Sequence, residues 1–71
     1  MTPEQEQAVR GALSDFMKYG TMVDFAVLAE HLEGKVGPVV IRKVLEQMAE
    51  QGQVMVDGDM ETGLSIFIIA P

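Results

Sequence analysis

Basic side chains are scarce in this chain, and three of the five lie close together: Lys35, Arg42 and Lys43. Arg42 or Lys43 would suit the O6 and N7 acceptors of guanine in a DNA major groove, while Lys35 would hold a phosphate. The alternative is a solvated helix face, on which Lys43 and Glu50, or Arg42 and Glu46, simply balance charge. The candidate DNA-contacting residues are Lys35, Val39, Arg42, Lys43 and Glu46.

Acidic side chains alternate along residues 57–61. Asp57, Asp59 and Glu61 occupy the first, third and fifth positions of a calcium-loop spacing. Such a loop needs glycine at its sixth position and glutamate at its twelfth, where this chain has Thr62 and Ile68. The spacing therefore indicates an acidic turn that keeps a hairpin soluble, and no metal site.

The chain has one histidine and no cysteine. His31 has no second ligand in a recognisable metal motif, so we expect it at the surface or at the boundary of the core. Gly34-Lys35 lacks the rest of a phosphate-binding loop, and no nucleophile motif accompanies the histidine. We therefore expect no catalytic residue, no metal, no cofactor and no small-molecule substrate.

The basic cluster is positioned by a predicted helix over residues 38–51. Pro38 suits the first helical position, because its fixed φ fits there and its missing N–H would be unpaired anyway. Gly52 suits the position just past the end. One face carries an apolar stripe with helical spacing. The stripe is Ile41, Val44, Leu45 and Met48.

A first helix is predicted near the N-terminus. Thr2 is a good N-cap, Pro3 suits the first position, and Gln5 can close a capping box back to Thr2. Gly20 is expected to end this helix. Its apolar face consists of Val9, Ala12, Leu13, Phe16 and Met17.

A short strand and a second helix are predicted between these two helices. Residues 21–23 are β-prone and indicate a minimal strand. Asp24 is the expected N-cap of a helix that continues through about Glu33. Gly34 then opens a turn into the helix that begins at Pro38.

After Gly52 the apolar period changes from 3.6 to 2, which predicts a hairpin of strands 54–56 and 64–69. Residues 57–63 form its loop. Both faces of the last strand are apolar, so one face needs a cover. We expect a homodimer or partner interface there; the alternative is that the first helix and the N-terminus cover it. The interface candidates are Leu64, Ile66, Phe67, Ile68 and Ile69.

Bulk properties limit the classes of protein that fit. Seventy-one residues allow a single domain, residues 1–71, without disulfides. The net charge of −6 means that nucleic-acid binding must rest on a local cationic patch. No apolar run reaches membrane-spanning length, and the N-terminus lacks a signal pattern. We therefore expect a cytoplasmic protein.

This element order resembles that of the winged-helix family. The resemblance covers residues 3–69 and rests on Leu28-Ala29 with Leu32, Ile41-Arg42-Lys43-Val44-Leu45, Met48, Gly52 and Val54. It implies an α+β winged helix-turn-helix fold, with residues 38–51 as the recognition helix and Asp57, Gly58, Asp59 and Glu61 in the wing. Two departures are a turn about two residues longer than usual and acidic side chains where DNA-binding wings often carry basic ones.

The resemblance implies two functions of different kinds. Most winged-helix domains bind duplex DNA, which predicts a transcriptional regulator that acts as a homodimer on two half-sites. A substantial minority bind proteins, which predicts an acidic interaction module or a subunit of a larger complex. Neither function is enzymatic.

Overall fold

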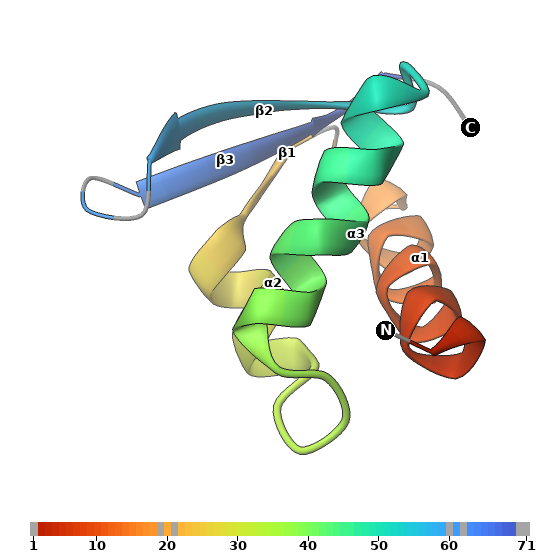
Figure 1. Ribbon diagram of the computed structural model, residues 1–71. Helices are drawn as coiled ribbons and strands as arrows, with labels where there is room; N and C mark the ends of the chain where they lie inside the picture. Colours follow the sequence, from red (N-terminus) through yellow and green to blue (C-terminus); the bar gives the residue numbers. More distant parts are fainter. Residues whose placement is uncertain (1, 19, 21, 60, 62, 70–71) are drawn as a thin grey trace.

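The computed structural model describes residues 2–18, 20, 22–59, 61 and 63–69. Three helices and three strands follow one another as α1 (Pro3–Met17), β1 (Met22–Asp24), α2 (Phe25–His31), α3 (Pro38–Glu50), β2 (Val54–Asp59) and β3 (Gly63–Ile68). The helices lie on one side of an antiparallel sheet (Figure 1). The predicted α+β class is confirmed. Among the described residues, no helix is long and apolar enough to cross a membrane.

Helix α1 begins with the predicted capping box. The Gln5 N–H donates to Thr2 Oγ1 at 3.2 Å, and the Thr2 N–H donates to Gln5 Oε1 at 2.9 Å. The helix ends at Met17, before the expected Gly20, because the Lys18 N–H bonds back to the Asp15 carbonyl and tightens the last turn.

Helix α2 begins where predicted but ends early. Asp24 occupies the N-cap position with extended backbone and pairs with Ser65 in the sheet, although its side chain makes no cap hydrogen bond. The helix stops at His31 instead of Glu33. The Leu32 carbonyl accepts from the Val36 N–H, which folds the chain into a turn that buries Val36.

Helix α3 follows its prediction closely, from Pro38 to Glu50, and Gly52 beyond it has φ +76°. All four stripe residues are buried: Ile41, Val44, Leu45 and Met48. They would contribute roughly 6–12 kcal/mol gross by their burial. This is comparable to the net stability of a whole small domain, about 5–15 kcal/mol.

The hairpin is longer than predicted, and its loop is shorter. Strand β2 continues through Asp59, and β3 begins at Gly63. Asp57, Gly58 and Asp59 therefore belong to a strand, and the prediction of a loop over residues 57–63 is wrong for most of its length. The turn-forming residues suggested a loop, but the ladder with β3 extends through them, and Gly58 within it has φ +94°, a conformation that glycine adopts without strain.

Strand β3 lies at the centre of the sheet, in the order β1-β3-β2. Its side chains alternate between the two faces of the sheet. Leu64 and Ile66 face the helices and are buried. Val23 and Val56 pair with Ile66 from the two neighbouring strands and lie on the same inner face.

Arg10 ties α1 to the junction between α3 and β2. Its Nη1 donates to Gln53 Oε1 at 2.8 Å, and its Nη2 lies 3.2 Å from Glu6 Oε1 and 3.4 Å from Gln51 Oε1. This guanidinium is therefore engaged in holding the fold together.

Leu45→Asp should unfold the protein. Leu45 is 1 % exposed, and an unpaired carboxylate in that position costs several kcal/mol. Circular dichroism should show no cooperative thermal transition at neutral pH. Gln47→Asp, at an exposed position of the same helix, is the matched control and should melt like the wild type. A native-like melt of Leu45→Asp would contradict this placement of the core.

Gly58→Ala should destabilise the hairpin by about 1–3 kcal/mol. Gly58 has φ +94°, and an added Cβ would collide with the carbonyl oxygen of Gly63. Gly11→Ala is the matched control, because a Cβ there meets nothing within 4 Å on a regular helix. That substitution should stabilise by about 0.5–1 kcal/mol. Urea denaturation of both variants measures the two changes, and equal midpoints would refute the assigned backbone geometry.

Candidate interaction surfaces

The exposed face of α3 carries four of the five residues expected to contact DNA. Val39 is 69 % exposed, and Lys43 is also exposed. Arg42 Nε lies 3.5 Å from Glu46 Oε1, with the side chains 53 % and 63 % exposed. Lys35, the fifth residue, is exposed in the turn before α3. The structure therefore displays these residues to solvent, with Arg42 already paired.

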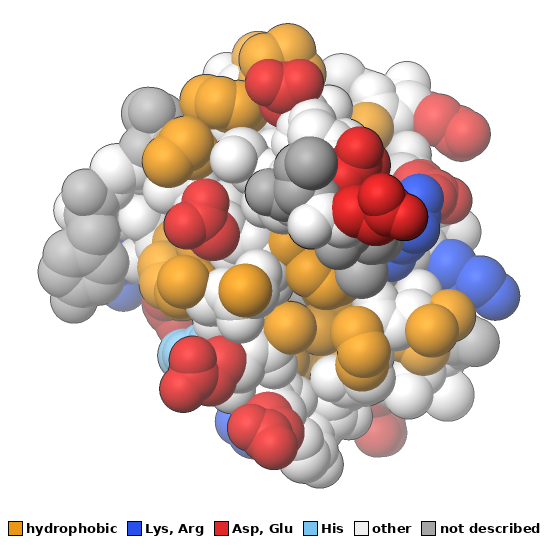
Figure 2. Space-filling view, turned by 90° about the vertical axis from the view of Figure 1, so that its left-hand side faces the viewer, with side chains coloured by type: hydrophobic (Ala, Val, Ile, Leu, Met, Phe, Trp, Pro, Cys, Tyr) orange, Lys and Arg blue, Asp and Glu red, His pale blue; other side chains and the backbone are white. Residues whose placement is uncertain are grey.

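A small hollow of about 180 Å³ separates α3 from the hairpin. Arg42 and Glu46 line it on the helix side, and Gly58 lines it on the hairpin side. Asp57 and Asp59 flank Gly58 in the sequence, so the hairpin that borders this hollow is acidic. Figure 2 shows acidic side chains beside the basic ones on this face. The local potential at α3 is therefore less positive than its two cations suggest.

Three of the five basic side chains form salt bridges. Arg10 pairs with Glu6, Lys18 with Asp15 at 3.7 Å, and Arg42 with Glu46. Within the described part of the chain, Lys35 and Lys43 are the basic side chains without a salt bridge. A phosphate-binding surface would have to be built mainly from these two.

The uncovered face of the sheet presents a row of large apolar side chains. Met22 and Met55 pair with Phe67 from opposite sides, so the three lie next to one another across the sheet. Met22 and Met55 are each 52 % exposed, and Phe67 is partly exposed. Ile69, two residues beyond Phe67, is 61 % exposed. We call Met22, Phe67, Met55 and Ile69 the outer row.

The expected interface on the last strand divides between the two faces. Leu64 and Ile66 are buried in the core, and Ile68 packs against the core, so all three side chains face the helices. Leu64 and Ile66 are therefore inaccessible to a partner. Phe67 and Ile69 lie on the other face. The helices cover the inner side of the sheet and leave the outer row uncovered (Figure 1).

Met22 and Met55 belong to this surface but were not predicted from the sequence. The sequence could have placed Met55 on this surface. Side chains alternate along a strand, so inward-facing Val54 and Val56 put Met55 on the outer face of the sheet. Met22 carries no such signal. Its place beside Phe67 depends on the register between β1 and β3, which are 45 residues apart at this pair.

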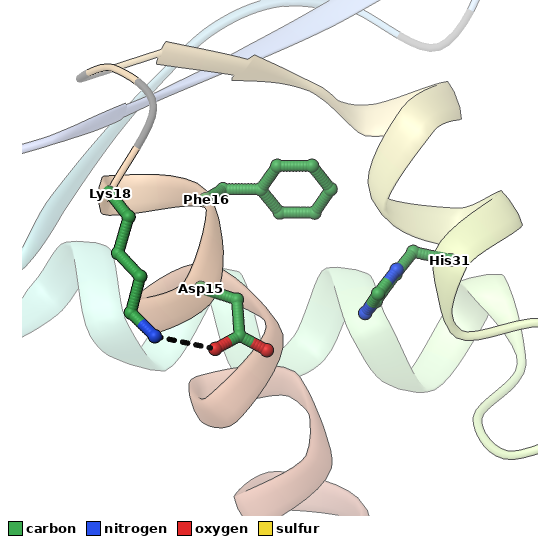
Figure 3. A pocket seen from close by; sticks show the side chains of 4 residues that line it. All are labelled: Asp15, Phe16, Lys18 and His31. Atoms are coloured by element: carbon green, nitrogen blue, oxygen red, sulfur yellow. Dashed lines mark ion pairs between the residues drawn. The ribbon is translucent and has the colours of Figure 1, made fainter.

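A second hollow, of about 270 Å³, lies where the ends of α1 and α2 approach each other. The rings of Phe16 and His31 meet edge to face, with centroids 5.4 Å apart (Figure 3). Asp15 is directed to Lys18, and no hydrogen bond joins it to His31 in the described structure. His31 is exposed, and within the described residues no hydrogen bond orients its imidazole.

Among the described residues, no group of three histidine or acidic side chains could hold a metal ion. Comparison with protein-family models, curated protein sequences and solved structures gives no match, so the functional argument rests on the surfaces described above.

Proposed function

We propose that this chain is a winged-helix interaction module that binds another protein through the outer row. The observation that carries the proposal is the adjacency of Met22, Phe67 and Met55 on a sheet face that no helix covers. Contiguous exposed apolar side chains mark contact sites far more often than isolated ones do. Methionine suits such a site, because its unbranched side chain adapts to the shape of a partner.

The winged-helix part of the proposal is supported by the order of elements. A helix, a short strand, two helices and a hairpin follow one another, and β1 joins the hairpin by pairing with β3. This order agrees with the family that the sequence resembles. The position of α3, with its stripe buried and its other face exposed, is also the one expected of a recognition helix.

A protein is the better-supported partner because of the distribution of charge. Arg42 is paired with Glu46, and the neighbouring hairpin carries Asp57 and Asp59. A helix docked in a major groove would bring these carboxylates close to phosphates, which carry the same charge. A protein partner meets no such repulsion.

Met55→Lys should abolish or strongly weaken binding to peptide ligands selected from a random display library on the wild-type protein. Burying a methionine contributes about 1.5–3 kcal/mol, which corresponds to a roughly 10- to 150-fold loss of affinity. Val39→Lys is the matched control, because Val39 is also an exposed apolar side chain but lies on α3. The measurement is fluorescence anisotropy with the selected peptides.

Two controls accompany this experiment. Thermal melts should show that both variants keep the fold. Light scattering should test the predicted homodimer, because a dimer formed through the outer face of the sheet would cover the outer row. Ligands that lose affinity only for Val39→Lys would move the site to α3. A library that gives no ligand sensitive to Met55→Lys would refute the proposal.

Duplex DNA is a second candidate partner, favoured by the exposure of Lys35, Arg42 and Lys43 at and before α3. Three phosphate contacts would give a log–log salt slope near −2.7, so DNA binding would weaken about fortyfold between 50 and 200 mM salt. Anisotropy with random duplex DNA measures this slope. Arg42→Glu/Lys43→Glu should abolish binding, while Lys18→Glu, just beyond the end of α1, should leave most of it. No binding of the wild type at 50 mM salt would exclude DNA.

A further inference from the structure

Two acidic side chains, with a serine between them, lie beside the outer row on the same face of the sheet. Asp24 in β1 and Asp57 in β2 both pair with Ser65, which lies between them in β3. Residues two apart along a strand share a face, so Asp24, Ser65 and Asp57 lie next to Met22, Phe67 and Met55 respectively. We call Asp24, Ser65 and Asp57 the acidic row.

The spacing of these two rows follows from the geometry of the sheet. Two residues along a strand span about 7 Å, which is the distance between the outer row and the acidic row. Two strand spacings amount to about 10 Å, which separates the backbones at Asp24 and Asp57. Beyond them, Asp59 pairs with Gly63 on the same face and extends the negative charge towards the hairpin end.

The carboxylates of the acidic row are available to a partner. Asp24 is exposed and makes no side-chain cap to α2. Among the described residues, Asp57 Oδ1 accepts a hydrogen bond only from the neighbouring Gly58 N–H, at 3.0 Å. The salt bridges of the described structure use Glu6, Asp15 and Glu46, and none uses Asp24 or Asp57. Hydrophobic and acidic side chains lie side by side along the upper part of Figure 2.

We infer that the partner is a cationic amphipathic segment of another protein. Its apolar side chains cover the outer row, and its lysine or arginine side chains lie about 7 Å away over Asp24 and Asp57. This inference rests on the proposed function and specifies the chemistry of its partner. The outer row supplies most of the affinity, while the acidic row sets orientation and selects against other partners.

The same charges argue against other occupants of this face. A second copy of the chain would bring an identical acidic row and a net charge of −6. Nucleic acids and anionic lipid surfaces carry phosphates, which the carboxylates repel. A basic protein segment satisfies both rows at once.

The test uses the display library on three forms of the full chain: wild type, Asp24→Asn/Asp57→Asn and Glu30→Gln/Glu33→Gln. Asparagine keeps the shape of aspartate and the Oδ1 acceptor, so the fold should be unchanged. The glutamate pair is exposed at the end of α2 and just beyond it, and its substitution removes the same amount of charge from another surface. It therefore controls for the general attraction of cations to an acidic protein.

Ligands that depend on Met55 should be several-fold enriched in lysine and arginine when selected on the wild type. The enrichment should persist on Glu30→Gln/Glu33→Gln and disappear on Asp24→Asn/Asp57→Asn. For one such ligand, the aspartate variant should bind about 2- to 25-fold more weakly at 50 mM salt, as expected for two exposed ion pairs. The difference should shrink at 500 mM salt, where such pairs are screened.

The other outcomes separate the two proposals. Met55-dependent ligands without cationic enrichment would overturn the inference about charge and leave the proposed function standing. Enrichment lost equally on both double variants would also overturn it, because the attraction would then be non-specific. An absence of Met55-dependent ligands would overturn the proposed function and this inference together.

Discussion

The fold depends on the central position of β3. This strand pairs with β1 on one side and β2 on the other, while Leu64 and Ile66 pack under the helices. Since side chains alternate along a strand, burying these two fixes Ser65 and Phe67 on the opposite face. If the pairing of β1 or β2 with β3 shifted by one residue, the side chains of that strand that now face the helices would lie on the outer face. The register of β3 with its two neighbouring strands therefore determines which side chains form the core and which form the exposed surface.

The charges of the molecule are distributed so that few cations remain unpaired. Arg10 is engaged between α1 and the residues that lead into β2, and Arg42 pairs with Glu46 on the exposed face of α3. The carboxylates at Asp24 and Asp57, in contrast, have no cationic partner in the described structure. The surface thus combines an apolar row with uncompensated negative charge, which is an arrangement suited to a basic partner and poorly suited to phosphate.

Much of the fold could be predicted from local sequence signals. The capping box of Thr2 and Gln5 marked the start of α1, and Pro38 and Gly52 marked the two ends of α3, because caps depend on residues a few positions apart. The early end of α2 and the length of the hairpin could not be predicted in this way. They depend on the burial of Val36 and on pairing with β3. The exposed surface was predicted least well: Phe67 and Ile69 were identified, but Met22 and Met55 join them only through the register of distant strands.

The exposure of Met22 and Met55 also has a chemical consequence. Methionine residues that are 52 % exposed are accessible to oxidants, whereas the buried Met48 is shielded. Oxidation converts methionine to a polar sulfoxide, which methionine sulfoxide reductases can reverse. A sulfoxide at either position would place a polar group beside Phe67 without disturbing the core. Among the methionines whose side chains the structure describes, the two on the surface that we assign to a partner are therefore the more easily altered by peroxide.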